Sequence, residues 1–239
     1  MHRFANPARF LRITDAVLPW SAALTIVLLA LGLYYGLWAS PVDYQQGATV
    51  RIMYIHVPAA WMGMMIYSLM AIASAVALIW RHPLADLIAK AAAPIGASFT
   101  FICLVSGSLW GAPTWGTWWV WDARLTSVLI LFFLYLGYIA IWQAFDDPTR
   151  AARAAAIVAL VGFVNIPIIK FSVDWWNTLH QGESLFTGHG SEIDPTMLRP
   201  LILMALAFTA YFITVLIYRV RAEIIARKLR VLRLSAIEG

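Results

Sequence analysis

Long apolar stretches alternate with short polar connections along the whole chain. Six of these stretches are almost free of charged residues, and each is long enough to cross the roughly 30 Å hydrocarbon core of a bilayer as an α-helix. This pattern predicts an all-α integral membrane protein in which residues 1–239 form a single membrane domain. The expected spans are residues 16–38, 57–80, 91–109, 125–145, 154–171 and 200–218.

The composition agrees with a membrane protein. The chain is 62% hydrophobic and only 12% charged, whereas about a quarter of the residues in a soluble domain are charged. The net charge of +5 does not indicate nucleic-acid binding, because the basic residues lie mostly at the ends of the apolar stretches. The single cysteine, Cys103, excludes an intramolecular disulfide and a c-type haem attachment motif in this chain. It is expected to be a small buried residue.

The distribution of lysine and arginine predicts the orientation in the membrane. Six spans put both termini on one side, and most of the 17 basic residues fall on that side. Only Arg51, Arg124, Lys170 and Arg199 fall on the other. Because cytoplasmic connections are enriched in lysine and arginine, both termini are expected in the cytoplasm. The first span is too long for a signal-peptide core and is expected to be retained.

The segment WGTWWVWDAR, residues 115–124, is the most unusual part of the sequence. Five of the chain's 12 tryptophans lie between Trp110 and Trp121. Glycines and a proline before this segment argue against a continuous helix from the third span, so residues 110–124 are expected to form a separate short interfacial helix or loop. If this element were helical, one face would carry Trp115, Trp118, Trp119 and Asp122.

Two interpretations of the tryptophans are open. Tryptophans gather at membrane interfaces as an aromatic belt, and this explains those at the ends of spans. The dense cluster instead favours a shelf for a large flat ligand, against which indole rings can stack. The tryptophans expected to bind such a ligand are Trp110, Trp115, Trp118, Trp119 and Trp121.

Three histidines lie on the same side of the membrane as the tryptophan segment. His56 is at the start of the second span, His180 follows a tryptophan pair, and His189 lies between two glycines. A flat aromatic ligand with a central metal ion needs two neutral imidazoles, one on each face, and haem is such a ligand. His56 and His180 are therefore the expected iron ligands.

Two arginines on that side are suited to the propionates of haem. Arg51 precedes His56 by five residues, and Arg124 directly follows the tryptophan segment. A guanidinium pairs well with a carboxylate through charge-assisted hydrogen bonds. The alternative for either arginine is an ion pair with Asp43 or Asp122.

Four motifs resemble those of a known family. WGTWWVWDARLTS (residues 115–127) is similar to the signature of haem-handling membrane proteins with a tryptophan-rich WWD motif. YIHVPAAW (54–61), FDDP (145–148) and WWNTLHQG (175–182) resemble the smallest of these proteins, the cytochrome c maturation protein C family. The resemblance runs from about residue 43 to residue 182, and the count of six spans agrees with it.

This resemblance implies a site and a set of partners. His56 and His180 would be the axial ligands of haem iron, and the tryptophan segment with Asp122 would cradle a transiently bound haem b. The chain would present this haem to a periplasmic haem chaperone at the outer face of the bacterial inner membrane, for c-type cytochrome biogenesis. The implied partners also include an ABC-type ATPase, its permease subunit and a small single-span membrane protein.

Two other functions are alternatives to haem delivery: a haem-translocating permease and a haem lyase. A haem-translocating permease is disfavoured because an intramembrane path usually carries ionisable or strongly polar residues, and Asn165 is the main one within the spans. The sequence has no phosphate-binding loop, so ATP hydrolysis belongs to another chain. A haem lyase is disfavoured because no acid, base or nucleophile stands out. The chain is therefore not expected to be an enzyme, except as far as it positions haem.

Overall fold

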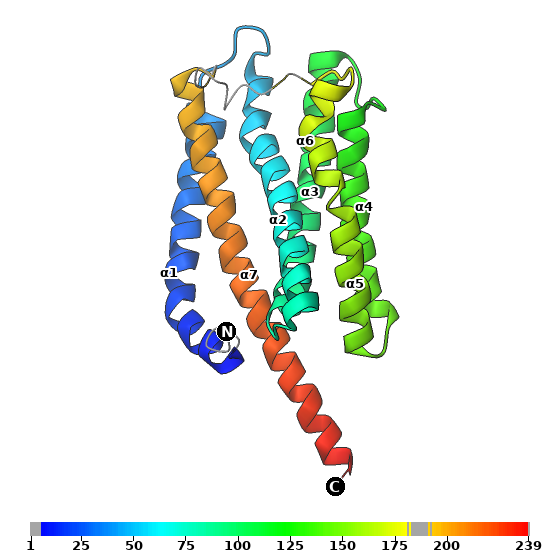
Figure 1. The fold of residues 1–239 in the computed structure, drawn as a ribbon. Coiled ribbons are helices and arrows are strands. Elements are labelled where there is room, and N and C mark those ends of the chain that lie inside the picture. The colour runs from blue at the N-terminus through cyan, green and yellow to red at the C-terminus, as the bar shows by residue number, and fades with distance from the viewer. Residues whose placement is uncertain (1–5, 181, 183–190, 192, 239) are drawn as a thin grey trace.

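The fold is a bundle of long α-helices (Figure 1). The computed structural model describes residues 6–180, 182, 191 and 193–238, and this part of the chain contains no β-strand. Six helical segments are long and apolar enough to cross a membrane, which confirms the predicted all-helical membrane protein. The helices are α1 (Pro7–Leu33), α2 (Met53–Trp80), α3 (Ala85–Trp115), α4 (Ala123–Ala144), α5 (Pro148–Gly162), α6 (Asn165–Trp175) and α7 (Pro195–Glu238). A π-helical turn, Tyr34–Ala39, extends α1, and a 3-10 helix, Ala48–Ile52, leads into α2.

The helices α2 and α3 pack together at the centre of the bundle. α7 packs on α1, α2 and α3, whereas α4 packs on α3, α5 and α6. Figure 1 shows the start of α1 and the end of α7 at the same end of the bundle, together with the connections 81–84 and 145–147. This end is termed the basic end. The opposite end holds residues 40–47, 116–122 and 176–180 and is termed the tryptophan end.

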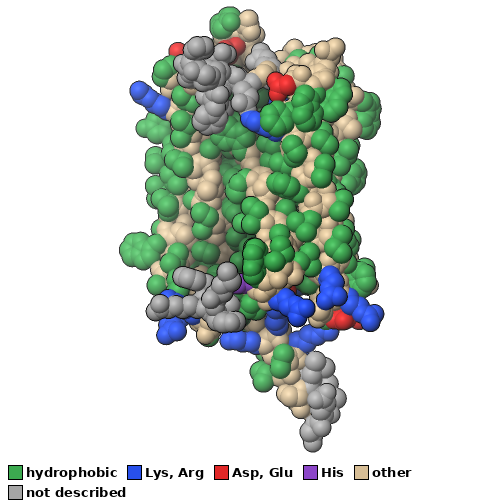
Figure 2. Space-filling model, viewed as in Figure 1, with side chains coloured by type: hydrophobic (Ala, Val, Ile, Leu, Met, Phe, Trp, Pro, Cys, Tyr) green, Lys and Arg blue, Asp and Glu red, His purple; other side chains and the backbone are tan. Residues whose placement is uncertain are grey.

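Charge is concentrated at the basic end. Figure 2 shows most of the visible lysine and arginine side chains there, and a largely hydrophobic surface between the two ends. Lys90 Nζ lies 2.7 Å from a carboxylate oxygen of Glu223, and Arg227 lies 2.8 Å from Asp86. These two ion pairs join the start of α3 to α7, where α7 projects beyond the other helices.

Several helix ends are fixed by capping residues. The side chains of Asn6, Asp122 and Asp147 accept hydrogen bonds from backbone N–H groups in the first turns of α1, α4 and α5. α3 ends at Gly116, whose φ of 74° lies in the left-handed region that glycine adopts without strain. The cap at Gly116 and the cap at Asp122 define the short connection between α3 and α4 at the tryptophan end.

The helix α3 is longer than the sequence predicts. The predicted third span, 91–109, ends before residues 110–124, whereas α3 continues through Gly111 and Pro113 to Trp115. The expectation that these residues interrupt the helix is wrong. At a membrane a helix satisfies its own backbone N–H and C=O groups, and this outweighs a cost of about 1 kcal/mol for each glycine. The first two tryptophans of the segment therefore stand on a rigid helix.

The predicted fifth span, 154–171, consists of two helices. α5 and α6 meet at Phe163 and Val164 and together form one membrane-crossing segment. Asn165 is buried at this junction, and its Nδ2 donates to the carbonyl oxygen of Ser127 at 2.9 Å. The buried amide of this span thus has a structural partner on α4.

Candidate functional site

His56 lies near the start of α2 and faces α3. Its Nδ1 is 3.1 Å from the carbonyl oxygen of Cys103 and 3.1 Å from the hydroxyl of Ser106. A carbonyl oxygen only accepts, so this geometry places the proton on Nδ1 and leaves the lone pair on Nε2. The ring also contacts Trp110 edge-on, with centroids 5.7 Å apart. His56 is therefore held as a neutral imidazole whose Nε2 can bind a metal ion.

His180 lies a few residues beyond the end of α6. Its ring contacts Trp115 edge-on at a centroid distance of 4.9 Å, and its Nδ1 is 3.7 Å from Oδ2 of Asp122. This distance makes the pair an electrostatic contact rather than a hydrogen bond. Burial, reinforced by the positive charge of Arg124, lowers the pKa of His180 to about 4, although Asp122 acts in the opposite direction. His180 is therefore neutral near pH 7, as an imidazole that binds a metal must be.

The helix α3 connects the two histidines. It contacts His56 through Cys103 and Ser106, and it contacts His180 through Trp115. Trp110, which contacts His56, and Trp115, which contacts His180, stand five residues apart on this helix. The structure thus places both predicted iron ligands in one region at the tryptophan end, from segments far apart in the sequence. His189 lies outside the described residues.

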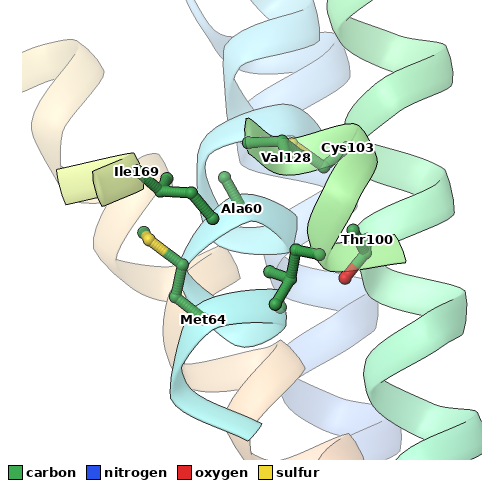
Figure 3. Close-up of a pocket in the computed structure, with 8 residues that line it drawn as sticks. Ala60, Met64, Thr100, Cys103, Val128 and Ile169 are labelled. Atoms are coloured by element: carbon green, nitrogen blue, oxygen red, sulfur yellow. The ribbon is translucent and has the colours of Figure 1, made fainter. Parts of the chain in front are cut away.

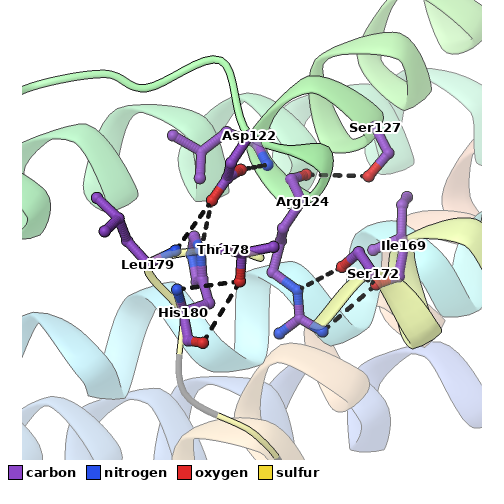
Figure 4. A network of polar contacts seen from close by, with 9 residues as sticks. Asp122, Arg124, Ser127, Ile169, Ser172, Thr178, Leu179 and His180 are labelled. Atoms are coloured by element: carbon purple, nitrogen blue, oxygen red, sulfur yellow. Dashed lines mark hydrogen bonds and ion pairs between the residues drawn. The ribbon is translucent and has the colours of Figure 1, made fainter. Parts of the chain in front are cut away.

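Asp122 binds two neighbouring elements (Figure 4). Its Oδ1 accepts from the backbone N–H of Leu125 at 2.8 Å and so caps α4. Its Oδ2 accepts from the backbone N–H of Leu179 at 3.3 Å and faces His180. Asp122, which the sequence could also explain as a partner of Arg124 or as a helix-terminal residue, therefore caps α4 and lies against the His180 region. Its expected place at the haem stays a prediction.

Arg124 is directed towards α6 (Figure 4). Its Nε donates to Ser172 Oγ at 3.0 Å, and its Nη2 donates to the carbonyl oxygens of Ile169 at 3.4 Å and Lys170 at 3.3 Å. Ile169 and Lys170 lie in the middle of α6, and each carbonyl oxygen has a second lone pair that can accept from the guanidinium. Arg124 thus joins the start of α4 to the end of α6. Its pairing with a propionate stays a prediction.

Arg51 has one donor that is not satisfied. It lies in the 3-10 helix before α2, and its Nη2 donates to the carbonyl oxygen of Ser40 at 2.9 Å. Its Nε is buried and has no hydrogen-bond partner among the described residues. A buried N–H without an acceptor is costly, and a carboxylate ligand would supply the acceptor. Arg51 therefore fits the predicted propionate role better than Arg124 does.

The five tryptophans from Trp110 to Trp121 divide into two groups. Trp110 and Trp115 stand on α3 and contact the imidazoles. The other three follow in the connection to α4. Trp118 and Trp121 are 61% and 76% exposed, and Trp119 packs edge-on against Trp121. The first group supports the histidines, and the second group offers an aromatic surface at the tryptophan end.

Residues 116–122 form a loop rather than a helix. The hydroxyl of Ser108 donates to the carbonyl oxygen of Trp118 at 2.8 Å, which ties this loop to α3. Such a side-chain-to-backbone hydrogen bond competes with helix formation. The spacing of apolar residues in the sequence does not predict it. The helical face predicted to carry Trp115, Trp118, Trp119 and Asp122 is therefore not formed.

Sequence reasoning missed the residues of α3 that hold His56. Cys103 is buried, as expected, but its carbonyl oxygen rather than its thiol contacts the imidazole. Gly107 leaves the space for the ring, since a Cβ there would lie 2.8 Å from His56 Cε1. Cys103, Ser106 and Gly107 are three and four residues apart. This spacing places them on one helical face and is the signal that the sequence offered.

A small cavity lies near His56, about one helical turn further along α2 (Figure 3). Its volume is about 20 Å³, room for about one water molecule. The cavity is far too small for a porphyrin and is not the ligand site. The residues that line it are Ala60, Gly63, Met64, Thr100, Cys103, Val128, Leu131 and Ile169.

Comparisons with known proteins agree over nearly the whole chain. Residues 1–235 match the family model described as CcmC, heme exporter protein C. The heme exporter protein C of Bradyrhizobium diazoefficiens is 61% identical over 96% of this chain and 87% of that protein. The proteins of the same name from Escherichia coli K12 and Haemophilus influenzae are both 50% identical, over 96% and 94% of this chain and 93% and 92% of their own lengths.

Proposed function

The chain belongs to the haem exporter protein C family, and from this premise we propose that it binds haem and delivers it to a periplasmic haem chaperone. The family assigns the chain to haem export and cytochrome c maturation. The finer proposal is that haem b binds transiently at the tryptophan end. In this proposal the chain works as a haem-transfer protein rather than as an enzyme.

The observation that carries this proposal is the pair of neutral imidazoles. His56 donates from Nδ1 to a backbone carbonyl, and burial keeps His180 neutral near pH 7. Each ring therefore has a nitrogen lone pair for the iron that haem supplies. Because α3 contacts both rings, the chain presents two ligands from separate segments, as a six-coordinate haem needs.

The surroundings of the histidines suit the rest of the haem. The buried Arg51 Nε lacks an acceptor, which a propionate oxygen would provide. The exposed Trp118 and Trp121 offer flat apolar faces, against which a porphyrin edge or the docked chaperone would pack. Haem held in this way has an edge open to a partner, which transfer requires.

The membrane arrangement follows from charge. The basic end is proposed to face the cytoplasm, which puts both termini inside and the tryptophan end in the periplasm. The membrane is then the bacterial inner membrane. The proposed partners are the haem chaperone, an ABC-type ATPase with its permease subunit, and a small single-span protein. ATP hydrolysis is assigned to the ATPase, because this chain has no phosphate-binding loop.

Haem capture at the periplasmic face is preferred to conduction through the bundle. The cavity beside His56 holds about one water molecule, and the buried Asn165 amide is bound to α4. A transport assay with this chain alone in vesicles would test the preference. Robust haem translocation would overturn it.

The decisive experiment is the visible spectrum of the purified full-length protein. Wild-type protein is expected to show the spectrum of low-spin haem with two histidine ligands. Replacing both His56→Ala and His180→Ala is expected to abolish this spectrum. His82→Ala, at the basic end, is the matched control and should leave it unchanged. An unchanged spectrum in the double variant would refute the assignment of the ligands.

A further inference from the structure

The two histidines are held in different ways. His56 lies within a continuous helix, and its Nδ1 contacts a backbone carbonyl and a hydroxyl of the neighbouring α3. His180 lies in an irregular segment, residues 177–180, that follows α6. The structure therefore combines one imidazole on a helix with one on a segment that has no regular secondary structure.

The His180 segment, residues 177–180, is attached to the rest of the protein through one carboxylate oxygen. Within the described chain, its polar contacts to other elements are the Leu179 N–H at 3.3 Å and the His180 Nδ1 at 3.7 Å, and both end on Asp122 Oδ2. The remaining polar contacts join Thr178 to the backbone of His180 and stay within the segment. The other contact of the histidine is the edge of the Trp115 ring.

Asp122 itself cannot move freely. Its other oxygen caps α4 at 2.8 Å, and its side chain is only 9% exposed. A carboxylate fixed at a helix start and facing two donors of a loop is suited to hold that loop in one orientation. The distance of 3.7 Å between His180 Nδ1 and Asp122 Oδ2 is longer than a hydrogen bond, so a small inward shift of the segment would convert the contact into one.

We propose that Asp122 is a positioning residue that latches the His180 segment to the start of α4, and that His180 is the iron ligand that detaches when haem is handed over. This inference rests on the proposed function, because it assumes that both histidines bind iron. His56 stays in place, since its contacts are made within the helical bundle. Within the described chain, opening the latch requires the loss of the contacts to Asp122 Oδ2 and of the edge contact with Trp115.

The first test uses the protein without haem. Asp122→Asn keeps an oxygen that can cap α4, but it places an NH₂ group where Oδ2 now faces the Leu179 N–H and His180. Amide hydrogen exchange in a peptide that covers residues 177–180 is expected to accelerate roughly tenfold, as the loss of one charge-assisted hydrogen bond implies. Exchange in α4 should stay unchanged, because the cap is preserved.

Asp147→Asn is the matched control. Asp147 caps α5 through Thr149 N–H at 2.8 Å at the basic end and has no contact with either histidine. This variant is expected to leave exchange in residues 177–180 at the wild-type rate. Equal exchange in Asp122→Asn and wild type would overturn the latch, whether or not the protein binds haem.

The second test measures haem release from the full-length protein. Asp122→Asn is expected to raise the rate of haem release roughly tenfold. In a His180→Ala background, the same change should have no further effect, because Asp122 acts through His180. An additive effect in the double variant would assign Asp122 a purely structural role and overturn the proposal. If wild-type protein binds no haem, the proposed function fails, and the exchange experiment still decides whether the latch exists.

Discussion

At position 107 the absence of a side chain decides whether His56 can occupy its place. Gly107 lies on the face of α3 that His56 contacts, and a Cβ there would lie 2.8 Å from His56 Cε1. This atom belongs to a ring that is already fixed by contacts to Cys103 and Ser106. The ring cannot shift without losing these contacts. Gly107 is therefore needed for the position of His56 rather than for the helix.

Gly107→Ala is therefore expected to weaken haem binding. An overpacked contact of this kind costs about 1–3 kcal/mol, which corresponds to a loss of affinity of roughly five- to 150-fold. Haem titration of the purified variant measures this. Gly137→Ala is the control, because a Cβ at that exposed helical position meets nothing within 4 Å. Similar affinities in the two variants would contradict this role of Gly107.

Variants of Trp121 and Trp20 distinguish the two interpretations of the tryptophans, a binding surface for haem and an aromatic belt at the membrane interface. Both side chains are highly exposed, at 76% and 78%, but Trp121 belongs to the loop beside the histidines and Trp20 to α1. Trp121→Ala is expected to reduce transfer of haem to the chaperone several-fold, with normal membrane insertion, whereas Trp20→Ala should change neither. If both variants lose insertion to the same degree and nothing else, the tryptophans are anchors only.

At the level of the helices, Arg124 joins the start of α4 to the end of α6. Its nitrogens donate to Ser172 Oγ and to the carbonyl oxygens of Ile169 and Lys170, in the second half of α6. The direction of the chain into the His180 region depends on this end of α6. Arg124 therefore acts on the site through helix placement.

Arg124→Lys is expected to destabilise the protein by about 1–3 kcal/mol, because a lysine cannot reproduce the fork of donors. Thermal unfolding in detergent measures this loss. Arg150→Lys is the control, since that side chain is 80% exposed at the basic end. A variant Arg124→Lys of normal stability but weak haem affinity would instead favour direct pairing with a propionate.

The sequence predicts the helices of this protein well, but it does not predict the contacts between them. Hydropathy places all six spans, because helices in lipid must be long and apolar. It misplaces the end of α3, since a bilayer-embedded helix tolerates glycine and Pro113 near its end. The site residues are visible as unusual histidines and tryptophans, but the link from Asp122 to His180 joins residues 58 positions apart and exists only in the folded chain.

The proposed orientation of the whole molecule in the membrane can be tested with cysteine labelling. Tyr44 is 91% exposed at the tryptophan end, Ser235 is exposed near the end of α7, and the native Cys103 is buried. A maleimide that cannot cross membranes should label Tyr44→Cys in intact spheroplasts and Ser235→Cys only after lysis. The reverse pattern would invert the proposed orientation.

Because α3 contacts both histidines, the spacing between its two contact points cannot change without disturbing the site. From Cys103 to Trp115 the helix spans about three turns, and its two ends touch different imidazoles. Inserting or deleting one residue between them would rotate Trp115 by about 100° relative to His56 and separate the two halves of the site. The number of residues between Cys103 and Trp115 is therefore fixed by the site, because it sets which side of α3 each histidine contacts.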